Sequence, residues 1–270
     1  MKIKTLIALA VLLYIHSQST AQPEKISWPD GAKAAICLTY DDAMETHLDI
    51  AIPDLNQYGL RGTFFLQGDN IMIDRIWEWR QASLKGHELG NHTAFHPCSE
   101  KLDFITPEFA AENYTVDRFL RELEVMNTLL FAIDGKKERT YAYTCGQTEF
   151  GGVSIIDTLR ISGLFFAARG SGRGIVEDFR TLDPFNVPSG GYEGIKGSEM
   201  IGYIEKAEQA GGLGVFTFHG VGGQYISVTR EAHQELLSYL SENRDKYWIA
   251  PFHEVMKHVI SERKRIGRDE

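Results

Sequence analysis

The sequence predicts an α/β fold in which parallel strands form one sheet and helices pack outside it. Short apolar runs typical of buried strands alternate along the chain with segments of helical periodicity. The length of 270 residues is close to that of a single α/β barrel. No linker, internal repeat or low-complexity tract divides the chain after its first residues. We therefore expect one domain.

The composition excludes several classes of protein. Hydrophobic residues make up 43% of the chain and charged residues 24%, which is typical of globular proteins. These values exclude a disordered chain, a collagen-like chain and a polytopic membrane protein. The formal net charge of −9 argues against nucleic acid as a main partner, because phosphate binding needs clustered lysine and arginine. Three cysteines are too few for a disulfide-based scaffold.

Residues 1–21 match the three-part pattern of a secretory signal peptide. Lys2 and Lys4 form a positive first region, an apolar run covers residues 6–15, and small residues end at Ala21. The alternative is a transmembrane anchor, but the run is too short to cross about 30 Å of hydrocarbon. We expect a secreted or periplasmic mature domain of residues 22–270, with no stable membrane span.

In the first half of the chain, the expected strands are short apolar or β-branched runs. They cover residues 34–40, 62–66, 87–92 and 140–143. The expected helices have apolar residues three or four positions apart. One carries Leu48, Ile52 and Leu55 and ends before Gly59, and a second covers residues 76–84. A third, over residues 107–133, begins at Pro107.

In the second half, strands and helices continue to alternate. Helices are expected over residues 155–162, 199–210, 229–243 and 252–263. Strands are expected over residues 164–168, 214–219 and 247–250. Residues 170–197 are rich in glycine, proline and serine, so we expect them to be mostly loop.

Polar residues suited to chemistry lie where strands end, the usual place for functional groups in parallel α/β folds. Asp41 and Asp42 follow the first strand. Neighbours on an extended segment point in opposite directions, so one carboxylate can bind a metal while the other faces a substrate or a water. The pair also fits the acidic start of a helix. The residues alone leave both interpretations open.

His92 and His96 are four residues apart, a spacing that places them on one side of a helical turn. Pro97 prevents a long helix from continuing through them. Together with Asp42 they make a His₂Asp set that fits Zn²⁺, another divalent metal or non-haem Fe(II). The alternative is two histidines with no shared role.

His219 ends an expected strand and is followed by Gly220-Val221-Gly222-Gly223. Glycines let a ligand or another backbone come close. The histidine fits a general acid at the mouth of a site, or a strand-end residue that caps a turn.

Three motifs together resemble a known family. Residues 39–43 are Thr-Tyr-Asp-Asp-Ala, residues 92–97 are His-Thr-Ala-Phe-His-Pro, and residues 216–219 are Phe-Thr-Phe-His. Their order and spacing resemble the polysaccharide deacetylase family, also called NodB-homology carbohydrate esterases. Its first motif reads Thr-Phe-Asp-Asp-Gly, and its second reads His-Ser/Thr-x-x-x-His-Pro. The resemblance covers residues 30–260.

The resemblance implies a distorted (β/α) barrel, commonly of seven parallel strands, and a metal-dependent hydrolase. It implies that Asp42, His92 and His96 hold a divalent metal. Zinc is the expected ion, with cobalt, nickel, manganese or iron as alternatives. It also implies that Asp41 is the catalytic base and His219 the catalytic acid.

The sequence departs from the family pattern at several positions. Ala43 replaces the glycine of the first motif. The third motif usually reads Arg-x-Pro-Tyr-Gly, but here Ala142 stands about where its arginine should be, and Cys145 takes the tyrosine position. A backbone N–H at Cys145 can still serve an oxyanion. We hypothesise that Arg169 supplies the missing cation to Asp41; the alternative is a structural or surface arginine. The family's tryptophan-bearing fourth motif is not evident.

All three cysteines lie near these motifs. We hypothesise a Cys98–Cys145 disulfide, formed in an oxidising compartment, with Cys37 buried and free. Three free thiols, or a thiol near the metal, are the alternative.

The expected function is a secreted, metal-dependent hydrolase that removes N- or O-linked acetyl groups from a carbohydrate. The expected partner is an acetylated glycan or oligosaccharide. One alternative is an amidase acting on the C–N bond of a small substrate, since one fold can host different chemistries. Another is a carbohydrate-binding protein that has lost catalysis. The sequence indicates neither the sugar nor the oligomeric state.

Overall fold

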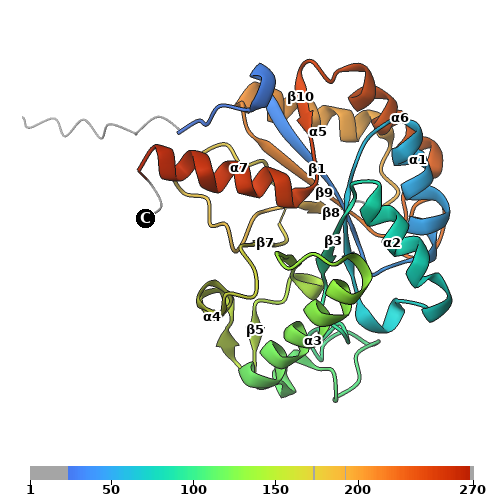
Figure 1. Cartoon of the computed structure of the whole chain (residues 1–270), viewed down its shortest axis with the longest axis vertical. Coiled ribbons are helices and arrows are strands. Elements are labelled where there is room, and N and C mark those ends of the chain that lie inside the picture. The colour runs from blue at the N-terminus through green and yellow to red at the C-terminus, as the bar shows by residue number, and fades with distance from the viewer. Residues whose placement is uncertain (1–23, 173, 192, 268–270) are drawn as a thin grey trace, which may run out of the picture.

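The computed structural model describes residues 24–172, 174–191 and 193–267 (Figure 1). The predicted signal peptide, residues 1–21, lies outside the described residues. Within the described ranges, no helix has both the length and the apolar character needed to cross a membrane.

The centre of the molecule is a parallel sheet. Its strands lie in the order β7-β4-β3-β2-β1-β9-β8, and β10 pairs with β1 beside this path. Every neighbouring pair in it is parallel. The strands are β1 (Ala34–Asp41), β2 (Thr63–Leu66), β3 (Glu88–Asn91), β4 (Thr140–Ala142), β7 (Ala167–Arg169), β8 (Gly190–Gly191), β9 (Leu213–Phe218) and β10 (Tyr247–Ile249).

A short segment joins the two edges of this path into a barrel. Val187 forms a parallel bridge with Arg169 of β7, and Gly170 donates a backbone hydrogen bond of 2.8 Å to the Val187 carbonyl. A few residues later, Gly190 pairs with Phe216 of β9. The expected distorted barrel of seven parallel strands is confirmed, with β10 as an additional short strand.

Helices surround the barrel. They are α1 (Ile52–Gln57), α2 (Ile76–Leu84), α3 (Val116–Asp134), α4 (Ile156–Ser162), α5 (Gly197–Ala210), α6 (Arg230–Glu242) and α7 (Phe252–Arg265). Figure 1 shows α1, α2, α5 and α6 on one side of β1 and α7 on the other. The buried residues of α3 include Phe119, Leu123, Met126 and Leu130, whose spacing of three or four residues makes one apolar face.

The two faces of β1 enter different cores. Ala34, Ile36 and Leu38 pack in a cluster with residues of α1, α2, α5 and α6. Ala35 and Cys37 point the other way and pack in a cluster that includes apolar residues of α7. All of β1 is buried, which explains its nearly continuous apolar sequence. The alternation places Asp41 on the same face as Ala35 and Cys37.

The predicted helix over residues 107–133 begins too early. Helix α3 starts at Val116, because Thr115 caps it: the Thr115 hydroxyl accepts a hydrogen bond of 3.1 Å from the Arg118 N–H. The residues after Pro107 form turns and a short 3₁₀ helix at Ala111–Asn113. A proline suits a first helical turn, but the side-chain cap decides where this helix begins.

Other predictions hold within a few residues, with three further differences. The strand expected over 164–168 is β7, Ala167–Arg169. The helix that contains Ile52 begins with a π-helical turn at His47–Ala51. Two short pairings were not expected: β8 inside the predicted loop 170–197, and the antiparallel pair β5 (Glu149–Phe150) and β6 (Val153–Ser154).

Candidate active site

The structure brings all the predicted site residues to one cavity. The cavity has a volume of about 990 Å³ and lies where the carboxyl ends of the parallel strands meet. It is lined by Asp41, Asp42, His92, His96, Cys145, Arg169 and His219, among others. These residues follow or end strands β1, β3, β4, β7 and β9.

Asp42 faces both histidines of the second motif. Its Oδ1 atom lies 3.3 Å from His92 Nε2 and 3.2 Å from His96 Nε2. Burial by itself would raise the pKa of the Asp42 carboxyl, but hydrogen bonds from these two histidines hold the pKa well below its usual range. Asp42 takes this direction because its φ of 79° turns the chain sharply after β1.

The donor set of Asp42, His92 and His96 fits a divalent metal. One ligand atom from each residue lies within 4.8 Å of the other two. In a tetrahedral site with bonds of about 2.0–2.1 Å, neighbouring ligand atoms are about 3.3 Å apart, close to the two distances above. Two imidazoles and one carboxylate suit zinc and leave room for water and substrate.

The two histidines are held differently. His92 Nδ1 lies 2.9 Å from the carbonyl oxygen of Ala142. A carbonyl can only accept, so Nδ1 carries a proton, and the lone pair of Nε2 is available when a metal replaces the hydrogen bond to Asp42. His96 has a φ of 53°, and its N–H donates to the Thr93 hydroxyl at 2.8 Å.

Asp41 faces the inside of the barrel and pairs with Arg169. Arg169 Nη2 lies 2.5 Å from Asp41 Oδ2, and both side chains are buried. The hypothesised ion pair is therefore formed. Arg169 Nη1 donates to the hydroxyls of Ser189 at 3.0 Å and Thr217 at 2.5 Å. Asp41 Oδ1 is buried and has no hydrogen-bond partner among the described residues, so it is available to accept a proton.

His219 lies near the second carboxylate oxygen of Asp42, whereas His92 and His96 face the first. Its Nε2 is 3.8 Å from Asp42 Oδ2, and its carbonyl oxygen accepts a 2.8 Å hydrogen bond from His47 Nε2. Burial lowers the pKa of the His219 imidazole. Its Nδ1 is buried without a hydrogen-bond partner in the described part of the chain.

Sequence reasoning missed Tyr225, Ser189 and Thr217. The Tyr225 hydroxyl donates a 2.9 Å hydrogen bond to Asp42 Oδ2. Burial raises the pKa of this tyrosine, so it remains a donor. Tyr225 lies in the loop after His219, and its position in that glycine-containing loop was the one available signal. Ser189 and Thr217 are ordinary residues whose role depends on how the barrel closes.

One wall of the cavity is apolar. Phe95, Phe104 and Phe109 line it, and the rings of Phe95 and Phe109 have centroids 5.4 Å apart. Phe109 was expected in the helix 107–133, but it reaches the cavity because that helix begins later. Ile226 and Tyr143 add apolar surface to the lining.

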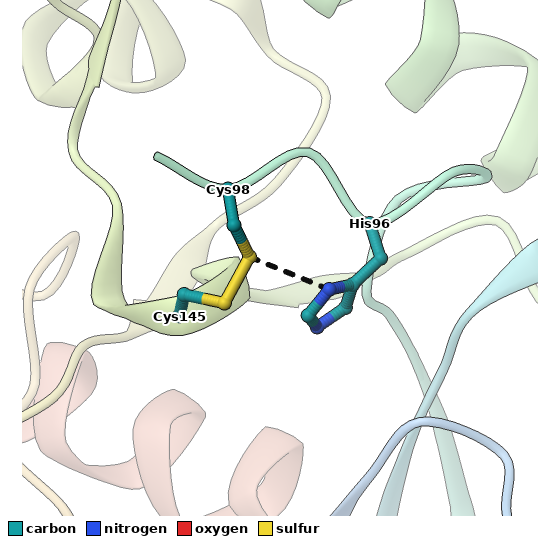
Figure 2. Close-up of side chains that lie close together, drawn as sticks. All are labelled: His96, Cys98 and Cys145. Atoms are coloured by element: carbon teal, nitrogen blue, oxygen red, sulfur yellow. Dashed lines mark hydrogen bonds between the residues drawn. A yellow bond between two sulfur atoms is a disulfide. The ribbon is translucent and has the colours of Figure 1, made fainter. Parts of the chain in front are cut away.

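The structure contains the hypothesised disulfide. Cys98 and Cys145 are bonded, and Cys37 is free and buried. Figure 2 shows the disulfide beside the imidazole of His96, with Cys98 Sγ 3.4 Å from His96 Nδ1. The bond therefore joins the segment that carries His96 to the segment that follows β4.

A comparison with family models matches part of the chain. Residues 29–151 match the model of the polysaccharide deacetylases, a range that contains both motifs built around Asp42 and His92. The chain is similar to this family over somewhat less than half of its length. Arg169 and His219, which also line the cavity, lie beyond the matched residues.

Three curated relatives share part of the sequence. The chain is 30% identical over 103 residues to a peptidoglycan-N-acetylglucosamine deacetylase of Bacillus cereus. The matched segment covers 36% of this chain and 32% of the relative. It is 30% identical over 107 residues to a peptidoglycan-N-acetylmuramic acid deacetylase of Bacillus subtilis, covering 39% and 36%. A gellan lyase of a Bacillus species is 28% identical, over 48% of this chain and 5% of the relative. The matches thus span about a third or less of each relative.

Solved structures share the fold of this chain. A candidate polysaccharide deacetylase from Mycobacterium smegmatis has a TM-score of 0.64 at 14% identity, covering 88% of this chain and 94% of that one. A mutant of a CE4-family pseudoenzyme has a TM-score of 0.52 at 17% identity, covering 83% and 67%. At these identities the likeness establishes the fold alone.

Proposed function

We propose that this protein is a secreted, metal-dependent deacetylase that hydrolyses N- or O-linked acetyl groups on a carbohydrate. The observation that carries the proposal is the pair of adjacent carboxylates with separate partners. Asp42 faces two histidines in a metal-ligand arrangement, while Asp41 is held by a buried arginine beside it. The match of residues 29–151 to the polysaccharide deacetylase family supports this chemistry.

Asp42, His92 and His96 would hold the metal. A divalent ion at such a site polarises a carbonyl and lowers the pKa of water. The role of the protein is to orient the ligands: the carbonyl of Ala142 fixes the tautomer of His92, and Tyr225 donates to the second oxygen of Asp42.

Asp41 is the proposed general base. Its Oδ1 atom is free to accept a proton from an attacking water, and Arg169 on Oδ2 holds the carboxylate in one orientation. In families with the usual third motif, an arginine at about position 142 would do this. Here Arg169, at the end of β7, supplies the cation from another strand.

His219 and Cys145 complete the proposed machinery. His219 would donate a proton to the departing amine or alcohol. The backbone N–H of Cys145 would stabilise the oxyanion that forms on the acetyl carbonyl. Cys145 lines the cavity, and its φ of 49° sets the direction of this short turn.

An acetylated glycan is the proposed substrate. Two relatives are named for the deacetylation of peptidoglycan sugars, which favours an acetylated amino sugar among the candidates. The amino-terminal pattern of residues 1–21 supports export, and a disulfide is typical of oxidising compartments. Residues 22–270 are proposed as the mature catalytic domain.

Acetate release from a panel of acetylated glycans tests the proposal. The panel contains chitin oligomers, peptidoglycan and acetylated xylan, together with small amides, and each assay is run with a chelator and with added Zn²⁺ or Co²⁺. We expect metal-dependent acetate release from at least one glycan and none from an Asp42→Ala variant. Release from small amides alone would favour the amidase. Glycan binding without turnover would favour an inactive binding protein, a fate for which a pseudoenzyme of the same fold is a precedent.

A further inference from the structure

We propose that the Cys98–Cys145 disulfide positions His96 as a metal ligand, so that the affinity of the site for a divalent ion depends on this bond. The inference rests on the proposed function in one respect: it takes Asp42, His92 and His96 as the metal ligands. It adds a role for two cysteines that the proposed chemistry does not otherwise use as side chains.

The two histidines differ in the partner of their second ring nitrogen. A metal-ligating imidazole is normally oriented by a hydrogen bond from its other ring nitrogen to a carboxylate, a carbonyl or a water. His92 has such a partner, the Ala142 carbonyl at 2.9 Å. The corresponding atom of His96, Nδ1, instead faces Cys98 Sγ at 3.4 Å (Figure 2). Sulfur is a weak acceptor, so contact and shape must orient this ring more than hydrogen bonding does.

The backbone around His96 also needs to be held. His96 and Thr93 both have positive φ, 53° and 64°, a region that residues with a side chain rarely occupy. Such conformations persist only where the surroundings enforce them. On the amino-terminal side, Glu122 accepts hydrogen bonds from the N–H groups of Ala94 and Phe95 at 3.1 and 2.9 Å.

On the carboxyl-terminal side, the segment is tied to the turn after β4. The Thr144 hydroxyl donates to the Pro97 carbonyl at 2.6 Å, and the next residue along each segment forms the disulfide. Cys98 is fully buried, so its sulfur has a fixed place against the imidazole. The covalent bond therefore sets the position of His96 relative to Cys145, whose N–H is the proposed oxyanion donor.

The disulfide is also reachable. Cys145 is exposed and lines the cavity, whereas the free thiol of Cys37 is buried inside the barrel. A reductant that enters the cavity can thus attack the bond at Cys145 while the protein stays folded. Cys37 offers a matched control, because it takes no part in the disulfide and does not line the cavity.

The test compares metal affinity in the wild-type chain, a Cys98→Ala/Cys145→Ala double variant and a Cys37→Ala control. Dissociation constants for Zn²⁺ are measured by competition with a chromophoric chelator, and Co²⁺ absorption reports the ligand set. Circular dichroism and thermal melting of the metal-free proteins report folding. Loss of an orienting partner typically weakens metal binding about 10–100-fold. We expect that loss in the folded double variant and none in the control.

Reduction of the disulfide in the folded protein distinguishes a role in orienting His96 from a role in overall stability. A phosphine reductant cleaves the S–S bond, giving two thiols and the phosphine oxide, whose oxygen comes from water. Wild-type and Cys37→Ala proteins should lose Zn²⁺ affinity on reduction, and the double variant should not respond. Co²⁺ absorption that indicates thiolate ligation in the reduced protein would overturn the proposal, because the sulfurs themselves would then take the metal.

The remaining outcomes are also decisive. A folded double variant whose Zn²⁺ affinity equals that of the wild type would overturn this inference alone. If the double variant does not fold, reduced wild-type protein replaces it, and unfolding there as well would make the disulfide a structural staple and the proposal wrong. A wild-type protein that binds no divalent ion would overturn both this inference and the proposed metal dependence.

Discussion

Asp41 and Asp42 show how adjacent residues acquire separate tasks. Asp41 continues the extended backbone of β1 and points into the barrel, where Arg169 holds it. Asp42 leaves the strand with a φ of 79° and points toward His92 and His96. The backbone turns at Asp42, so two side chains of the same type point to different partners. The partners alone distinguish the two carboxylates.

The two carboxylates are therefore expected to fail in different ways when changed. Asp41→Asn removes the proposed base and should lower kcat about 10²–10⁴-fold while Zn²⁺ affinity stays within a few-fold of the wild type. Asp42→Asn removes a proposed metal ligand and should weaken Zn²⁺ binding itself. Steady-state kinetics at saturating metal, with chelator competition, separates the two. Equal loss of metal affinity in both variants would contradict the assignment.

Arg169 should orient Asp41 for catalysis. Arg169→Ala removes the ion pair that fixes Oδ2 of Asp41, so Oδ1 no longer has one direction in the cavity. We expect kcat to fall while Zn²⁺ affinity stays within a few-fold of the wild type. Arg169→Lys keeps a charge and should lose less activity. Steady-state kinetics with chelator competition measures both values, and an Arg169→Ala enzyme with full activity would refute the role.

At the scale of elements, strand β3 shows how barrel packing constrains the sequence. Gly90 lies in β3, opposite Phe65 of β2. A Cβ on Gly90 would lie 2.4 Å from Phe65 Cδ1, closer than any real contact. The ring of Phe65 therefore occupies the space that a side chain at position 90 would need.

Gly90→Ala should destabilise the protein by about 1–3 kcal/mol, the usual cost of an overpacked core. Gly202→Ala is the matched control, because no atom lies within 4 Å of the added carbon and alanine favours the helix α5. Urea unfolding gives both values. A Gly90→Ala protein as stable as the wild type would mean that Phe65 repacks freely.

Helix boundaries were predicted correctly where the local signals agreed, and the prediction was wrong where they competed. Helix α2 has the expected bounds, Ile76–Leu84, since apolar spacing and a following glycine agree. Helix α3 begins nine residues later than Pro107 predicts, because Thr115 provides a side-chain cap. Because α3 starts late, Phe109 lies in the loop before it and lines the cavity. The wrong helix boundary therefore also hid a residue of the cavity wall.

At the scale of the whole molecule, buried neutral histidines link stability to pH. His87 and His233 are fully buried, and burial lowers the pKa of His87 to about 3 and that of His233 to about 4. In the unfolded chain each would titrate near 6.5. The stabilising effect of their neutral forms is therefore complete above pH 6.5, and it is lost as the pH falls toward 4, because the unfolded chain binds the protons first.

We expect the free energy of unfolding to fall between pH 6.5 and 4 by about 1.4 kcal/mol per pH unit for each of these histidines. Denaturant titrations at several pH values measure the slope. His233→Gln should reduce the slope of unfolding free energy against pH by the contribution of one proton. The variant also loses the 2.8 Å contact between Tyr40 and His233 Nε2, which changes stability at pH 7 but not the slope. An unchanged slope in that variant would show that His233 does not contribute.

The fold class, most of the strands and the grouping of Asp42, His92 and His96 could be predicted from the sequence. These features depend on local periodicity and on motif spacing, which the order of residues contains. The pairing of Arg169 with Asp41 could be proposed because a charged residue ends a strand, but only the closure of the barrel brings β7 and β1 to face each other across the interior.

Three residues without a motif complete the site, and only contacts across the fold place them there. Ser189, Thr217 and Tyr225 come from distant segments and have no motif, yet they contact Arg169 or Asp42. The segment at residues 187–191 closes the barrel between β7 and β9 although its sequence reads as loop. Contacts of this kind depend on distances between segments far apart in the chain, and no local pattern of residues records such distances.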